Sequence, residues 1–202
     1  MVNPMPRSLG GPTKAQSKRD RLVEAALRLF EREGYRATGI DRILEEAGVA
    51  KMTLYNHFRS KDELILAALR LRDERSRDWL ARRVAELGKT PRERLLAVFD
   101  AAREWYVSDS FNGCLFARAC CEFAEEDHPV RAAAREHVRL LGRDLASLAR
   151  EAGAPDPEGL AESLMLLHVG ATTSAQINSC ATSAERARRT AETVVDRALS
   201  GR

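Results

Sequence analysis

Residues 38–64, TGIDRILEEAGVAKMTLYNHFRSKDEL, decide the fold of the N-terminal part of this chain of 202 residues. The first apolar side chains of the stretch follow the i, i+3, i+4, i+7 spacing of a helix with one buried face: Ile40, Ile43, Leu44 and Ala47. Gly48 comes next, at a position where a helix end favours a residue that tolerates positive φ. The stretch therefore predicts a short helix followed by a tight turn.

Two pairs of residues have the spacing of a capping box, in which a hydroxyl and a carboxylate satisfy free amides at a helix start. Thr38 with Asp41 is the first pair, and Ser60 with Glu63 is the second. The first pair predicts that Thr38 caps the helix that ends at Gly48. The second pair predicts that a new helix begins at Lys61.

The segment between the turn and the second cap carries many side chains that can donate or accept hydrogen bonds: Lys51, Thr53, Tyr55, Asn56 and His57. Leu54 and Phe58 are apolar and can pack back on the preceding helix. This pattern is typical of a helix-turn-helix, whose second helix enters the major groove of DNA. The alternative is an ordinary helical hairpin that binds nothing.

The string AGVAKMTLYNHFRSKDEL, residues 47–64, resembles the DNA-binding motif of TetR-type transcriptional regulators, the family named after the tetracycline repressor. The preceding string KRDRLVEAALRLFEREGYRATGIDRIL, residues 18–44, resembles the first helix of that family and the entry to its second. The resemblance covers roughly residues 16–66. Ala50 departs from it, because the family usually has Ser or Thr there, and an Ala cap loses about 1 kcal/mol of helix stabilisation.

The resemblance implies a role for each motif residue. Lys51, Met52 and Thr53 lie near the start of the recognition helix and are expected to reach base edges. Tyr55, Asn56 and His57 correspond to positions that contact phosphates, with Asn56 as a further candidate for a base contact. Thr38 and Lys61 lie at helix starts, which attract anions, and are expected to contact phosphates.

The rest of the chain is predicted to be helical, because Ala, Leu, Arg and Glu dominate and β-branched alternation is absent. The expected helices span residues 16–33, 39–47, 51–57, 61–87, 91–108, 113–126, 129–152, 157–180 and 184–199. The fold class is therefore all-α, with about nine helices. We expect a disordered basic tail over 1–15, a helix-turn-helix domain over 16–60, and a helical effector-binding and dimerisation domain over 61–202.

Charge is distributed unevenly along the chain, although the overall net charge is only +3. Residues 1–61 hold twelve Lys and Arg against seven Asp and Glu, whereas residues 62–202 hold 21 against 23. Positive charge is thus concentrated in the segment that carries the motif, as phosphate binding requires. Lys14, Lys18 and Arg19 are candidates for backbone or minor-groove contacts, or form a solvated tail. No run of eighteen apolar residues occurs, and the expected location is the cytoplasm.

Aromatic residues are concentrated between Phe99 and Phe123, and none follows. Such a cluster either fills the core or walls a ligand cavity, since small-molecule sites are mostly apolar. Composition alone favours the core. The resemblance favours the cavity, because many members of the family respond to a small molecule bound in this region. The candidate pocket residues are Phe99, Trp105, Phe116, Cys120, Phe123 and His168.

The helix expected over 157–180 is apolar or small around much of its surface, so it must be buried on more than one side. A subunit interface or a larger monomeric core would supply the second side. The resemblance implies a homodimer in which this helix and the helix over 184–199 form a four-helix interface. Two recognition helices would then lie about 34–36 Å apart on a palindromic DNA site. The candidate interface residues are Leu160, Leu164, Leu167, Ala171, Ala191 and Val195.

The four cysteines do not predict a metal site, because Cys114, Cys120, Cys121 and Cys180 include no CxxC pair. We expect small buried thiols, and a redox contact between chains through Cys121 or Cys180 remains open. No phosphate-binding glycine loop or catalytic constellation is visible, and neither a cofactor nor a metal is expected.

The pattern as a whole predicts a transcriptional regulator, most readily a ligand-released repressor that acts as a homodimer on a palindromic operator. Its expected partners are double-stranded DNA, a second copy of the chain and an unknown small-molecule effector. Two other classes compete with this interpretation. One is a small helical enzyme that uses the aromatic cavity and a thiol, and the other is a helical interaction module with a vestigial turn motif.

Overall fold

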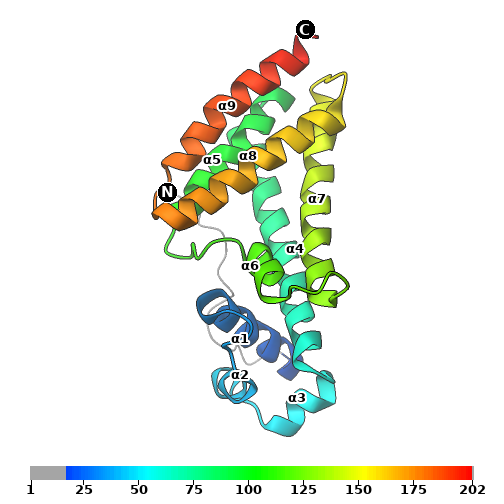
Figure 1. Ribbon diagram of the computed structural model, residues 1–202, viewed down its shortest axis with the longest axis vertical. Coiled ribbons are helices and arrows are strands. Elements are labelled where there is room, and N and C mark those ends of the chain that lie inside the picture. Colours follow the sequence, from blue (N-terminus) through cyan, green and yellow to red (C-terminus); the bar gives the residue numbers. More distant parts are fainter. Residues whose placement is uncertain (1–16, 202) are drawn as a thin grey trace. The chain divides into compact units, whose positions relative to one another are not determined.

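The computed structural model describes residues 17–201, and these residues form nine helices (Figure 1). The helices are α1 Lys18–Glu33, α2 Ile40–Ala47, α3 Lys51–His57, α4 Lys61–Leu87, α5 Pro91–Tyr106, α6 Leu115–Glu122, α7 Pro129–Glu151, α8 Pro157–Asn178 and α9 Thr182–Leu199. The prediction of an all-α fold is confirmed. The tail expected over 1–15 lies outside the described residues.

The sixth helix is shorter than the range 113–126 expected from the sequence. Gly113 has a φ of +79°, which keeps it out of the helix. Cys114 caps the helix, and its Sγ accepts a hydrogen bond from the backbone N–H of Ala117 at 3.4 Å. Phe123 leaves the helical conformation at the other end. Local composition predicted a helix here, but the glycine and the two flanking residues limit it to eight residues.

Packing divides the chain into two compact units. The first unit contains residues 17–75 and 114–137 of the described chain, and the second contains 76–113 and 138–201. The first unit therefore holds α1–α3, the first half of α4, α6 and the start of α7. The limits expected from the sequence, 16–60 and 61–202, remain a prediction about functional domains. By packing, residues 61–75 and α6 belong with the helix-turn-helix, because their apolar faces are buried in the same core.

The core of the first unit is built around Phe30 and Tyr35, which are completely buried with ring centroids 5.1 Å apart. Phe123 approaches Tyr35 edge-on at 5.8 Å. The other large buried side chains come from four helices: Leu22, Leu27, Leu29, Ile43, Leu54, Leu64, Ile65 and Leu69. These contacts fix α1, α2, α3 and the start of α4 in one rigid arrangement.

A buried ion pair also crosses this core. Arg72 on α4 lies 3.2 Å from Glu31 on α1, and their side chains are 9% and 17% exposed. Burial lowers the pKa of Arg72, and the neighbouring carboxylate of Glu31 opposes that shift. The carboxylate of Glu31 thus compensates the positive charge of the Arg72 guanidinium, which is largely shielded from water.

Glu31→Gln is expected to destabilise the protein by about 3 kcal/mol, because it leaves the Arg72 charge buried without its counterion. Denaturant unfolding followed by circular dichroism measures the change. Glu33→Gln is the matched control, because Glu33 lies on the same helix and pairs with Arg32 at an exposed position. Equal losses of unfolding free energy in the two variants would show that the buried pair contributes no more to stability than the exposed pair.

The core of the second unit lies between α5, α8 and α9, which pack against one another (Figure 1). Small residues on α9, among them Ala184, Ala187 and Ala191, are buried and let this helix approach closely. The hydroxyls of Tyr106 and Thr172 share a buried hydrogen bond of 2.7 Å, which joins α5 to α8. None of the described helices is both long and apolar enough to cross a membrane.

Candidate DNA-binding site

The turn between α2 and α3 is built as the sequence predicts. Gly48 ends α2 in the left-handed region with a φ of +61°, and its N–H donates to the carbonyls of Leu44 and Glu45. Arg21 on α1 donates from Nη2 to the carbonyls of Ala47 at 2.6 Å and Gly48 at 2.9 Å. A side chain at Gly48 would be strained in this conformation and would place its Cβ 2.9 Å from Arg21 Nη2. The glycine was predicted from the sequence, whereas the contact made by Arg21 was not.

The start of α2 differs from the prediction. Gly39 is the N-cap, and no side chain among residues 17–201 caps it. Thr38 is completely buried, and its Oγ1 donates to the carbonyl of Gly34 at 2.6 Å. The capping role predicted for Thr38 is therefore wrong, because its hydroxyl satisfies the end of α1 instead. The buried side chain is not available to a phosphate, so the contact expected at this helix start would have to come from backbone amides and stays a prediction.

The recognition helix α3 has one buried face and one exposed face. Leu54 and Phe58 are 1% and 4% exposed and anchor the helix to the core of the first unit. The opposite face exposes Lys51, Met52, Tyr55, Asn56 and His57, while Thr53 is half-buried. Met52 and Tyr55, at 70% and 54% exposed, are large apolar groups that the core does not use. Such a surface suits groove contacts, although each predicted contact stays a prediction.

Ala50 precedes α3 in an extended conformation, and no side chain of the described chain caps the helix. Ala50 thus leaves α3 without the side-chain cap that Ser or Thr would provide at this position. Thr53 N–H still donates to the carbonyl of Ala50 at 2.9 Å, so one backbone bond closes the first turn. Packing of Leu54 and Phe58 is what holds this short helix in place.

Lys51 makes an ion pair that the sequence did not indicate. Its Nζ lies 3.6 Å from Oδ1 of Asp41 on α2, and both side chains are exposed. Such a pair is worth little in water. Lys51 can therefore leave Asp41 for a base or phosphate at a small cost in free energy. Before DNA binds, the ion pair with Asp41 limits where the ammonium group lies.

Lys61 begins α4 after the cap that the sequence predicted. Ser60 Oγ accepts from the N–H of Glu63 at 3.2 Å, and the Glu63 carboxylate accepts from the N–H of Arg59 at 2.8 Å. Lys61 is half-buried, and its Nζ donates to the carbonyl of Arg36 at 3.4 Å. Burial lowers the pKa of Lys61, and the carboxylates of Glu122 and Asp62 oppose the shift. A phosphate contact by Lys61 would require it to leave this carbonyl.

Further cations lie on the same unit. The guanidinium of Arg19 lies over the ring of Phe58 at 5.3 Å, directly beside the end of the recognition helix. Lys18, Arg42 and Arg59 are exposed. Lys14, the other tail candidate, lies outside the described residues. Arg19 is thus a cation that lies next to the predicted interface.

The candidate pocket residues are divided between the two units. Phe116, Cys120 and Phe123 lie in the first unit, where Phe116 stacks on His137 at 3.6 Å. Phe99 and Trp105 are buried in the core of the second unit. Helix α6 thus carries its aromatic residues into a different core from α5, and a ligand contact by any of these five residues stays a prediction.

The second unit contains a cavity of about 290 Å³ between α4, α5, α7 and α8. Its apolar wall is formed by Leu80, Val84, Val98, Leu141, Leu145 and Met165. Polar groups at its edge include Arg94, whose Nε donates to the carbonyl of Gly88 at 3.3 Å, and Arg77, which pairs with Asp144. Among the predicted pocket residues, His168 is the one that lines this cavity in the described chain, next to the edge of the Phe99 ring.

Most of the candidate interface residues are buried within their own chain. Leu160, Leu164, Ala171, Ala191 and Val195 belong to the core of the second unit, and their role at an interface stays a prediction. The most regular apolar stripe of α8 is used for packing on α5 and α9. The surface of α8 instead exposes Leu166, Val169 and Ile177, which are 77%, 46% and 75% exposed.

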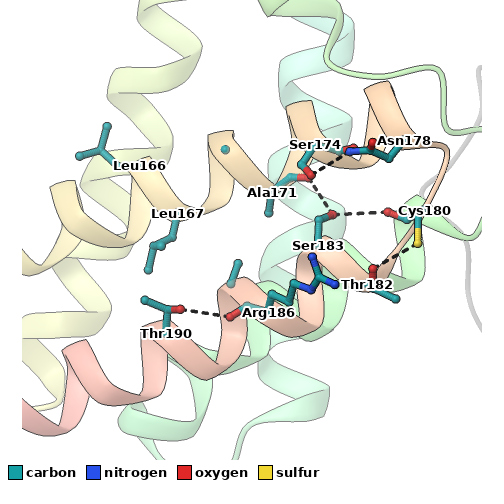
Figure 2. A pocket seen from close by; sticks show the side chains of 12 residues that line it. Leu166, Leu167, Ala171, Ser174, Asn178, Cys180, Thr182, Ser183, Arg186 and Thr190 are labelled. Carbon is teal, nitrogen blue, oxygen red and sulfur yellow. Dashed lines mark hydrogen bonds between the residues drawn. The ribbon is translucent and has the colours of Figure 1, made fainter.

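A groove of about 490 Å³ runs between α8 and α9, and Figure 2 shows the side chains that line it. Leu166, Leu167 and Ser174 lie on its α8 side, and Ser183, Arg186 and Thr190 lie on its α9 side. Ser183 Oγ donates to the carbonyl of Ala171 at 2.9 Å and ties the two helices together. Leu167, half-buried, is the one predicted interface residue of α8 or α9 outside the buried core of the described chain.

The cysteines are less buried than predicted. Cys121 and Cys180 are exposed, and Cys114 and Cys120 are half-buried. Hydrogen bonding with the Thr182 hydroxyl at 3.2 Å lowers the pKa of the Cys180 thiol. Within residues 17–201, no three His, Cys, Asp or Glu side chains gather as a metal site would require.

Comparison with known proteins gives two family matches. Residues 22–68 match the model of bacterial regulatory proteins of the tetR family, and residues 91–191 match a tetracyclin repressor-like C-terminal domain. A TetR-family transcriptional regulator from Streptomyces coelicolor superposes with a TM-score of 0.82 and 30% identity, over 90% of this chain and 96% of that one.

Two curated relatives from Mycolicibacterium smegmatis also match. The HTH-type transcriptional activator FasR is 38% identical over 104 residues, which is 50% of this chain and 46% of FasR. The HTH-type transcriptional repressor KstR2 is 32% identical over 96 residues, which is 46% of this chain and 45% of KstR2. The chain thus matches about half the length of these two relatives.

Proposed function

Because the chain belongs to the TetR family of bacterial regulatory proteins, we propose that it is a ligand-released repressor that acts as a homodimer on a palindromic operator. The chain is a DNA-binding transcriptional regulator of the helix-turn-helix type. Members of this family bind DNA operators, dimerise, and are regulators rather than enzymes. The similarity to the repressor KstR2 supports repression, and action on chromosomal DNA supports the cytoplasm as its location.

The exposed face of α3 is the observation that carries the proposal. Leu54 and Phe58 hold the helix to the core, and Arg21 fixes the turn before it, so Met52 and Tyr55 remain outside. A rigid helix that presents a cation, an apolar group and hydrogen-bonding groups has what direct readout of base edges requires. The phosphate contacts would come from Tyr55, His57 and the neighbouring cations.

The test is selection of bound duplexes from a random DNA library at near-physiological salt, with the consensus read by sequencing. We expect a palindrome with half-sites about one helical turn apart. Binding should also weaken steeply as salt rises, because phosphate contacts release counterions. A library that shows no enrichment with wild-type protein, at low salt as well, would contradict operator binding.

The homodimer is supported by the surface of α8. Leu166, Val169 and Ile177 are apolar side chains left exposed on a helix that also borders the groove with α9. Exposed apolar residues gathered on one element mark interaction sites. A second copy that places its own α8 and α9 on this surface would bury them and form a four-helix interface.

The effector is proposed to occupy the cavity between α4, α5, α7 and α8. Its wall is mostly apolar, with a few polar groups at the edge, as small-molecule sites are. Release would follow if the ligand binds better to a state whose two recognition helices no longer match the operator spacing. The ligand can shift that balance only by its difference in affinity for the two states.

Val84→Trp is expected to abolish the response to an effector while operator affinity stays unchanged. Val84 is buried in the cavity wall, and an indole there would occupy space that a ligand needs. A small-molecule screen for release of the selected operator supplies the compound, and titration against both proteins measures the response. A compound that releases wild type and Val84→Trp equally well would place the effector elsewhere.

A further inference from the structure

Helix α6 makes direct hydrogen bonds to the turn between α1 and α2. The carboxylate of Glu122 accepts from two successive backbone amides, from Tyr35 N–H at 3.2 Å and from Arg36 N–H at 2.7 Å. Both groups belong to the first unit, in which α6 lies next to α1 (Figure 1). A carboxylate that accepts two backbone N–H bonds makes strong, charge-assisted contacts.

A second charged side chain of α6 holds the end of α1. Arg118 Nη1 donates to the carbonyl of Phe30 at 3.1 Å and to that of Glu31 at 3.2 Å. Carbonyls in the last turn of a helix have no partner within the helix, and a cation there is stabilising. The hydroxyl of Tyr35 returns the contact by donating to the carbonyl of Leu115 at 3.0 Å. We call these five hydrogen bonds of Glu122, Arg118 and Tyr35 the α6 clamp.

The turn held by the α6 clamp sets the start of two further helices. Gly34 opens it with a φ of +90°, and a Cβ there would lie 2.8 Å from the Glu122 carboxylate. Thr38 closes it by its hydrogen bond to the Gly34 carbonyl, just before α2 begins. Lys61, at the start of α4, donates to the carbonyl of Arg36. The positions of α2 and α4 thus both depend on residues 34–38.

We propose that Glu122 and Arg118 are positioning residues for operator binding, although both lie outside the helix-turn-helix. The α6 clamp fixes the turn, the turn fixes the start of α2, and α3 packs against α1 and α2. Base contacts need side chains placed within a fraction of an ångström, whereas phosphate attraction tolerates displacement. Loss of the α6 clamp therefore lowers specific binding more than non-specific binding. The inference rests on the proposed operator binding.

Glu122→Gln tests this proposal. An amide at this position can accept one of the two hydrogen bonds, but its NH₂ group then faces a backbone donor. We expect affinity for the selected operator to fall about tenfold and affinity for a scrambled duplex at the same salt to stay unchanged. Amide hydrogen exchange should speed up at Tyr35 and Arg36 and stay slow in the cores of α1 and α2.

Glu125→Gln is the matched control, because Glu125 is an exposed acidic residue three positions beyond, and the substitution removes the same charge. It should leave both affinities and the exchange rates unchanged. Arg118→Gln should lower operator affinity in the same direction as Glu122→Gln. The double variant should lose less than the product of the two single effects, since both act on one turn.

Equal loss of operator and scrambled-duplex binding, together with a lower melting temperature, would show that Glu122 serves folding alone and would overturn the proposal. Unchanged operator affinity despite faster exchange at Tyr35 and Arg36 would overturn it as well. If wild-type protein selects no operator at all, the proposed function fails and the positioning role fails with it. The exchange rates, measured without DNA, would still report whether Glu122 holds the turn.

Discussion

Ile177→Asp is expected to convert the proposed dimer to a monomer and to lower operator affinity by about a hundredfold or more. Ile177 is 75% exposed on α8, the helix that borders the groove with α9. In a two-fold interface the substitution introduces two carboxylates, one from each chain, into an apolar surface. Each would be desolvated without a partner, which costs several kcal/mol.

The effect on DNA binding follows from the loss of the second half-site. A dimer binds its second half-site as an intramolecular event, and a monomer loses that advantage of effective concentration. Size-exclusion chromatography with light scattering measures the oligomeric state, and titration of the selected duplex measures the affinity. Leu166→Asp, on the same helix and 77% exposed, should behave in the same way.

Val138→Asp is the control for the Ile177 experiment. Val138 is 45% exposed on α7, so the same kind of substitution adds a charge to the second unit on a helix outside the proposed interface. It should remain a dimer and bind the operator as wild type does. A monomeric wild type, or an Ile177→Asp variant that stays dimeric and binds normally, would refute the proposed interface.

Lys51→Ala is expected to relax sequence preference at particular base pairs, at a cost of about 1–3 kcal/mol in discrimination. Lys51 is the first residue of α3, and its exposed ammonium group makes a weak pair with Asp41. Side chains at the start of a recognition helix reach base edges, and a lysine there can donate to guanine. The variant should therefore select a consensus that is degenerate at one or two positions.

Tyr55→Ala is the comparison that separates base contacts from phosphate contacts. Tyr55 is exposed on α3 and is predicted to contact a phosphate, so its loss should weaken binding to all duplexes similarly and leave the consensus unchanged. Parallel selections with wild type and both variants at one salt concentration measure the difference. Recovery of the wild-type consensus by Lys51→Ala would rule out base readout by this residue.

Features that depend on neighbouring residues in the sequence were predicted well. The apolar spacing of residues 40–47, the glycine at position 48 and the cap at Ser60 each act within one or two turns of helix, and the structure has all three. The lack of a side-chain cap at Ala50 was also visible in the sequence. The cap predicted at Thr38 was wrong, although a cap is also a local feature. The Thr38 hydroxyl could bond either to the start of α2 or back to the carbonyl of Gly34, and only packing decides between them.

Features that depend on which helices meet were not predictable. Arg118 and Glu122 look in the sequence like ordinary charged residues of a surface helix, yet they hold the end of α1 and the turn after it, more than eighty positions away. The apolar stripe that contains Leu160 and Leu164 was expected at a subunit interface and is buried in its own chain. A helix that is apolar nearly all round gives no sign of which side its own core will cover.

By itself, the sequence determined the helices, the turn before α3 and the chemistry of the exposed face of α3, because helix periods, glycine stops and side-chain types are local properties. Only the tertiary structure decided that α6 packs with the helix-turn-helix, that the cavity lies among α4, α5, α7 and α8, and that Ile177 rather than Leu164 faces outward. These outcomes arise from contacts between residues far apart in the chain. They are set by how the apolar faces of whole helices pack against one another, which no short stretch of sequence specifies.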